Sequence, residues 1–138
     1  MNGRHHLPAS ILLSIRGFVV MIAISAALLG CAPQPLVNVS DPEAAVTLLD
    51  QSFLAWKAGR SVDELRQADP PVYVAEDLWK QQARLTDFSI DDDGELFGTN
   101  VRIRVTVKGF EKSGKRFSDQ LHYLVTTTPA LTIVREDR

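Results

Sequence analysis

Two short stretches of this 138-residue chain have residue types that bind ions in other proteins. Gly109 to Lys115 has the G-x-x-x-x-G-K spacing of a phosphate-binding loop, but Arg116 stands where a magnesium-binding Ser or Thr is required. The residues that follow alternate with a period of two, which is typical of a strand, so no helix N-terminus is expected to hold phosphate there. We therefore interpret Lys112 to Lys115 as a hairpin turn.

The acidic run Asp91-Asp92-Asp93-Gly94-Glu95 suggests a calcium-binding loop. Aligning Gly94 with the glycine of such a loop places Ser89 at its first position and Asn100 at its twelfth, so the first carboxylate and the bidentate Glu are both missing. Cys31 is the single cysteine, which excludes a thiolate-rich zinc site. We expect a solvated acidic turn here and no metal site in the chain.

His122 and Asp119 are candidates for a general acid–base pair. They lie three positions apart on a predicted strand, so their side chains should point to opposite faces of the sheet. We therefore assign no catalytic residue.

Two further groups of residues could form binding surfaces. Arg102, Arg104 and Lys108 should share one face of a strand, where they could contact anionic headgroups or an acidic envelope partner; a solvated sheet face is the alternative. A second group of residues could line a small pocket between the helices and the sheet. The alternative is that these residues pack in the core. The residues of this possible pocket are Trp56, Tyr73, Trp79, Asp119 and Tyr123.

Helical signals come first along the chain. The segment Ser40-Asp41-Pro42-Glu43 predicts a helix start, with Asp41 capping in front of Pro42 or with Ser40 and Glu43 forming a capping box. An apolar stripe at helical spacing then predicts a core-facing helix that ends at Gly59. A second capping box, Ser61 with Glu64, predicts a short helix, and residues 75–83 could form another.

Four strands are predicted after the helices, at residues 85–90, 101–108, 116–127 and 131–135, separated by turn residues. Val101, Ile103, Val105 and Val107 alternate with polar residues and should face the helices. Short connections favour antiparallel neighbours. The expected fold is α+β, with N-terminal helices packed on one face of a curved four-stranded antiparallel sheet.

From Pro42 to Arg135, the order of these elements resembles the NTF2-like or cystatin-like α+β cone in a short form. In addition, the pattern Tyr123-x-Val125-x-Thr127-x-Pro129-x-x-Thr132-x-x-Arg135 looks like the closing strand pair of small uncharacterised bacterial lipoproteins. This second resemblance implies no activity. The first leaves open a small enzyme of NTF2-like or SnoaL-like type that uses the cone interior, with Asp119 and Tyr123 as its polar groups.

The N-terminus has the pattern of a secretory signal. Gly17 to Leu29 is uncharged and apolar, and Leu28-Leu29-Gly30-Cys31 resembles the bacterial lipobox. The resemblance implies a diacylglycerol thioether on Cys31, cleavage between Gly30 and Cys31, and acylation of the new amine. The domain plan is then a signal peptide at 1–30, a lipidated cysteine with a short tether at 31–41, and an α+β domain at 42–138. An uncleaved anchor and an unmodified cysteine are the alternatives.

Processing would make the chain more acidic. Removing residues 1–30 removes Arg4 and Arg16 and no acidic residue, which changes the formal charge from −2 to −4 and argues against a nucleic-acid partner. We expect a membrane-anchored, periplasmic-facing lipoprotein of the cell envelope. Ala32 stands where some bacteria place an Asp for inner-membrane retention, which favours the outer membrane.

The expected function is non-catalytic binding of a small ligand or an envelope protein, without a cofactor other than the covalent lipid. The alternatives are the small envelope enzyme and a purely structural interaction module that uses the basic face.

Overall fold

The structure, a computed structural model, describes residues 36–137. The predicted signal peptide, its cleavage position at Gly30 and Cys31, and the first residues of the tether lie outside the described residues. The helices are α2 (Pro42–Lys57), α3 (Val62–Arg66) and α4 (Asp77–Lys80). The strands are β1 (Val72–Ala75), β2 (Arg84–Ile90), β3 (Glu95–Phe97), β4 (Asn100–Phe110), β5 (Arg116–Thr126) and β6 (Leu131–Arg135). Over this part of the chain, no helix is long and apolar enough to cross a membrane.

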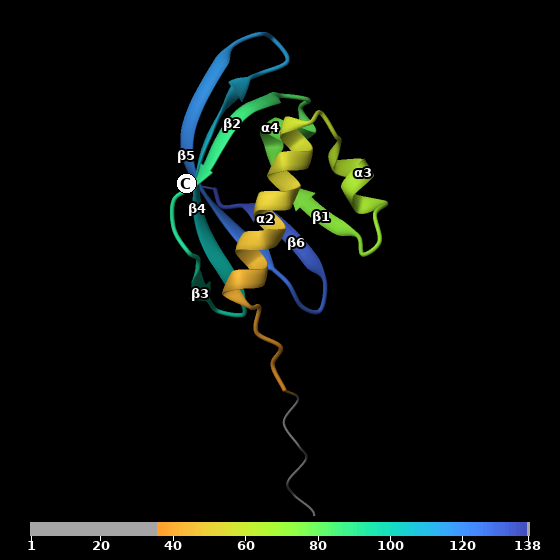
Figure 1. The fold of residues 1–138 in the computed structure, drawn as a ribbon, viewed down its shortest axis with the longest axis vertical. Helices are drawn as coiled ribbons and strands as arrows, with labels where there is room; N and C mark the ends of the chain where they lie inside the picture. The colour runs from red at the N-terminus through yellow and green to blue at the C-terminus, as the bar shows by residue number, and fades with distance from the viewer. Residues whose placement is uncertain (1–35, 138) are drawn as a thin grey trace, which may run out of the picture. The chain divides into compact units, whose positions relative to one another are not determined.

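The strands form one strongly curled sheet with α2 packed against it (Figure 1). Their order is β1-β6-β5-β4-β2, and the short β3 pairs with the beginning of β4. All neighbours are antiparallel except β1, which runs parallel to β6. The expected α+β class is therefore confirmed.

The predicted four-stranded antiparallel sheet is wrong in two respects, because the described residues form six strands and the sheet is mixed. Strand β1 has only four residues, too few for a periodic pattern, and its partner β6 lies far along the chain. Strand β3 has three residues, all of them exposed, so it carries no alternation of apolar and polar residues. The four predicted strands are present as β2, β4, β5 and β6, within two residues of the expected bounds.

Helix α2 begins with the first of the two predicted caps, in which Asp41 precedes Pro42. The Asp41 carboxylate accepts a hydrogen bond from the Ala44 N–H at 2.7 Å, and Pro42 follows it at the start of the helix. Ser40 has another role, because its Oγ accepts from the Thr127 N–H at 3.0 Å. Gly59 adopts φ +85° just after the helix, a conformation that favours glycine. The second capping box, Ser61 with Glu64, is present at α3.

The core lies between α2 and the concave side of the sheet. The apolar stripe of α2 is buried at Ala45, Leu49, Phe53 and Trp56. The four predicted inward-facing residues of β4 are also buried: Val101, Ile103, Val105 and Val107. The helical spacing of the apolar residues in α2 and their alternation in β4 therefore each predicted the face that is buried in the core.

Candidate functional site

The five residues predicted to line one pocket are not gathered in one place. Trp56, Trp79 and Tyr123 are buried in the core, whereas Tyr73 is 46% exposed on β1. Asp119 is half-buried on β5, opposite Val107 of β4. The structure therefore brings together the two tryptophans and Tyr123, and separates them from Tyr73.

The concave interior is filled by aromatic rings around Phe53. Its ring meets those of Trp56, Trp79, Phe88 and Tyr123 edge-on, with centroid distances between 5.1 and 6.5 Å. Trp56 and Trp79 stack with centroids 5.0 Å apart and planes 6° from parallel. Each indole N–H donates to a backbone carbonyl at 2.8 Å, on Ala83 and Arg60 respectively. These contacts are those of a packed core.

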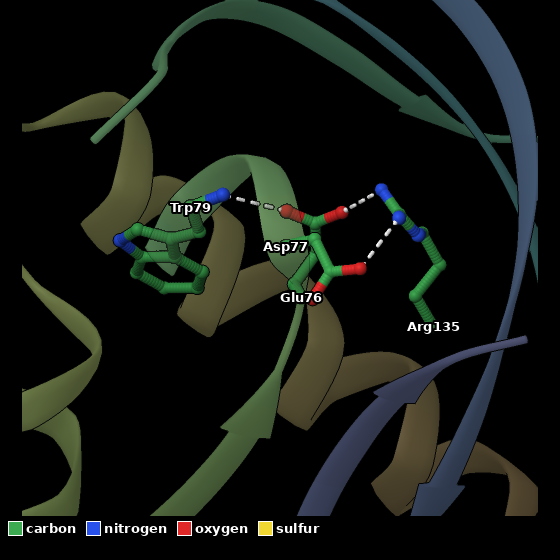
Figure 2. Close-up of polar contacts among 4 residues, drawn as sticks. All are labelled: Glu76, Asp77, Trp79 and Arg135. Carbon is green, nitrogen blue, oxygen red and sulfur yellow. Dashed lines mark hydrogen bonds and ion pairs between the residues drawn. The ribbon is translucent and has the colours of Figure 1, made fainter. Parts of the chain in front are cut away.

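A buried ion pair that was not predicted from the sequence borders this interior. Glu76 is fully buried; its Oε1 accepts from Arg135 Nη1 at 2.8 Å, and its Oε2 accepts from the Trp79 N–H at 2.7 Å. Asp77 Oδ2 accepts from Arg135 Nη2 at 3.0 Å (Figure 2). Glu76 thereby caps α4 and joins it to β6. Glu is not among the residues favoured at an N-cap, so the capping role of Glu76 has no signal in the sequence.

The surroundings of Glu76 disfavour its charged form. Burial raises the pKa of Glu76 above its ordinary value, while the Trp79 N–H and the Arg135 guanidinium act against that rise. Tyr123 lies opposite Arg135 in the β5–β6 register. Burial, and next the nearby Glu76 charge, raise the pKa of the Tyr123 phenol, whose hydroxyl has no hydrogen-bond partner among the described residues. Since both Glu76 oxygens are occupied, this cluster is suited to joining elements rather than to moving protons.

An open groove of about 320 Å³ lies between α3 and the β1–β6 strand pair. Tyr73 lies in this groove, with the Arg66 guanidinium carbon 5.8 Å from the centroid of its ring. Valines supply apolar surface, and Lys80 adds a second cation from the end of α4. The groove is lined by Val62, Asp63, Arg66, Tyr73, Val74, Ala75, Lys80, Thr132 and Val134. Apolar surface with a few charged groups at this size is typical of a small-ligand site.

The Glu76–Arg135 pair helps to position this groove. It joins α4, which supplies Lys80, to β6, which supplies Thr132 and Val134. The groove therefore rests on elements that are fixed to each other by buried, charge-assisted hydrogen bonds. We take it as the candidate functional site.

The three cations of the predicted basic face differ in their surroundings. Arg102 Nε donates to Glu136 Oε2 at 2.8 Å, and its guanidinium also lies over Phe97. Arg104 and Lys108 are exposed. The predicted face is therefore neutralised at its Arg102 end.

In the acidic run, Asp91 and Asp92 form hydrogen bonds to neighbouring strands, whereas the sequence predicts only a solvated turn. The Asp91 carboxylate accepts hydrogen bonds from Ser89, Thr106 and Gln120, and these bonds lower its pKa. Asp92 accepts from the backbone N–H of Arg104. The run thus connects the β2–β3 turn to β4 and β5. No group of three or more potential metal ligands occurs among residues 36–137.

The His122–Asp119 pair and the phosphate-loop spacing are both arranged as the strand pattern predicts. His122 lies opposite Arg104 and Asp119 opposite Val107, so the two belong to opposite faces of β5. Residues 111–115 form the turn between β4 and β5, and a strand follows, so the phosphate-loop spacing is a hairpin.

No protein-family model matches the sequence, and no curated protein or solved structure is significantly similar to it.

Proposed function

We propose that this chain is a membrane-anchored envelope lipoprotein whose domain binds a small ligand in the groove between α3, β1 and β6. The anchor rests on the lipobox resemblance of Leu28-Leu29-Gly30-Cys31, with residues 1–30 as signal peptide and Cys31 carrying the lipid. The domain would be a short member of the NTF2-like or cystatin-like folds, facing the periplasm from the outer membrane. The curled sheet around an N-terminal helix supports this assignment.

The observation that carries the binding proposal is the arrangement of Arg66 over the exposed Tyr73 ring. Arg66 and Lys80 place two cations at an apolar groove, against one acid, Asp63. A ligand with an apolar body and a carboxylate or phosphate group fits this chemistry, because the body contacts the valines and the anion meets the cations.

The alternative of a small envelope enzyme needs polar groups facing a cavity inside the cone. Tyr123 is instead fully buried with its ring against Phe53, and burial raises the pKa of its phenol, which disfavours proton transfer near neutral pH. Asp119 stands apart from it toward the hairpin end of β5. These positions support binding rather than catalysis.

The anchor is tested by metabolic labelling with radioactive palmitate. We expect label in the wild-type chain and none in the Cys31→Ser variant, which lacks the thiol that accepts diacylglycerol. Equal labelling of both chains, or of neither, would contradict the lipoprotein assignment.

The groove is tested by titrating the isotope-labelled chain with decanoate and with benzoate, following backbone amide NMR shifts. We expect shifts at Tyr73, Val74 and Thr132 that weaken in Arg66→Ala. The control is Arg104→Ala, which removes one positive charge from a different face of the domain and should bind both ligands as the wild-type chain does. Shifts in other regions, or equal shifts in both variants, would show that the groove is not the site.

A further inference from the structure

The hairpin end of the sheet carries a second cluster of cations, away from the groove. Arg84, Phe110 and Arg116 form one cross-strand row, because Phe110 of β4 is paired with Arg84 of β2 and with Arg116 of β5. Cross-strand partners place their side chains on the same face. Each guanidinium carbon lies 5.4 Å from the centroid of the Phe110 ring, so the two are at most 10.8 Å apart.

A recess of about 380 Å³ lies beside this row. Lys108 adds a third cation two residues before Phe110, on the same face of β4. Ser118 contributes a hydroxyl from β5. The recess is lined by Thr86, Lys108, Gly109, Phe110, Arg116, Phe117 and Ser118.

These cations differ from Arg102 because they are not neutralised. The ion pairs among residues 36–137 involve Arg102, Lys115 and Arg135, and none involves Arg84, Lys108 or Arg116. Asp87 is the register partner of Lys108, but the structure contains no ion pair between them. Two guanidinium groups on one ring repel each other, and a bound anion would offset that repulsion. Charge complementarity therefore favours an anionic occupant of this recess.

We propose that this recess docks an acidic segment of a partner polypeptide. Arg84, Lys108 and Arg116 present three cations from three neighbouring strands, which suits several carboxylates on one chain better than a single small anion. A membrane surface fits less well, because Phe110 is half-buried and flanked by the arginines in the sheet, so it does not protrude as an apolar wedge. This docking surface is separate from the groove at Tyr73.

The probe is fluorescein-labelled hexaglutamate, added to the full-length chain in zwitterionic detergent at low salt and followed by fluorescence anisotropy. We expect binding that weakens about tenfold or more in the double variant Lys108→Glu, Arg116→Glu. A matched variant, Arg66→Glu with Lys80→Glu, changes the net charge equally at the other groove and should bind within about twofold of wild type.

The outcomes separate this docking surface from other anion sites. Loss of binding in the Arg66 and Lys80 variant, equal loss in both variants, or no binding to the wild-type chain would overturn the proposal. So would binding to phosphatidylglycerol vesicles without binding to hexaglutamate, because a lipid surface would then be the partner. If the charge-reversed variant does not fold, Lys108→Gln with Arg116→Gln serves in its place, with Arg66→Gln and Lys80→Gln as its control.

Discussion

Arg135, at the end of the last strand, donates from Nη1 to Oε1 of Glu76 at 2.8 Å, although the two residues are 59 positions apart. Glu76 follows directly after β1, and Arg135 ends β6, so the pair closes the parallel β1–β6 unit at one end. It is a charge-assisted connection between the start of α4 and the sheet, and it joins a fully buried carboxylate to a guanidinium. We therefore expect the stability of the elements that line the groove to depend on this pair.

The first prediction concerns the Arg135 side of the pair. Arg135→Met should lower the free energy of unfolding by about 3–5 kcal/mol at neutral pH, because it leaves the Glu76 charge buried without its partner. Urea unfolding followed by tryptophan fluorescence measures this change. The control is Asp77→Ala, which removes the exposed second acceptor of Arg135 and should cost less than about 1 kcal/mol. Equal losses in both variants would show that Glu76 does not depend on Arg135.

The second prediction is a pH dependence caused by Glu76. Because burial raises its pKa above 4.5 in the folded state, the folded chain binds this proton more strongly than the unfolded chain. The contribution of Glu76 to stability is then fully present below pH 4.5 and is lost as pH rises through the raised pKa. Glu76→Gln should remove this loss, so its unfolding free energy, relative to wild type, should increase as the pH rises above 4.5. A constant difference across that range would contradict the prediction.

The third prediction concerns Asp91, whose contribution to stability depends on pH in the opposite direction. Three hydrogen bonds lower its pKa below 3.8, so its contribution is present above pH 3.8 and is lost as pH falls through the lowered value. Asp91→Asn should therefore lose less stability than wild type on acidification. Acid titrations of ellipticity compare the two chains, with the exposed Asp93→Asn as control. If wild type, Asp91→Asn and Asp93→Asn all unfold at the same pH, these hydrogen bonds do not stabilise the charged Asp91 carboxylate.

The local elements were predictable because their signals are local. The Asp41 cap, the apolar stripe ending at Trp56 and the alternation from Val101 to Val107 each lie within one segment and match the structure. By contrast, the parallel pairing of β1 with β6 joins a four-residue segment to a distant strand, and no periodicity indicates it.

The candidate site was predictable only in part, for the same reason. Tyr73 was identified as a possible pocket residue, but its groove depends on α3 and β6 approaching β1 in space. Glu76 lies beside Asp77 and resembles an exposed acid in the sequence; in the structure it is buried, and Arg135, 59 positions away, is its charged partner. The neutralisation of Arg102 likewise requires Glu136, which is 34 positions away.

The fourth prediction uses the Tyr123 hydroxyl, which has no hydrogen-bond partner within residues 36–137. A buried hydroxyl without a partner costs about 1–3 kcal/mol, so Tyr123→Phe should leave the unfolding free energy unchanged or raise it by about 1 kcal/mol. Its ring contact with Phe53 is retained. Thermal and urea unfolding measure the effect, and Tyr73→Phe on the surface is the control. A loss above about 1 kcal/mol in Tyr123→Phe would mean that the hydroxyl makes a stabilising bond, for instance to an internal water.

The last prediction concerns Gly109 of β4, which is paired with Leu85 of β2 and with Phe117 of β5. A Cβ at this position would collide with the backbone carbonyl of Arg84 and lie 2.7 Å from Cζ of Phe117. Gly109→Ala should therefore lower the unfolding free energy by about 2–3 kcal/mol, because the sheet must shift to admit a methyl group.

The double variant Gly109→Ala, Phe117→Leu identifies which neighbour sets that cost. Shortening Phe117 clears one contact, but the Arg84 carbonyl belongs to the paired strand and cannot rotate away, so little stability should be recovered beyond that of Phe117→Leu alone. Full recovery in the double variant would show instead that the aromatic side chain, and not the spacing of β2 and β4, requires glycine.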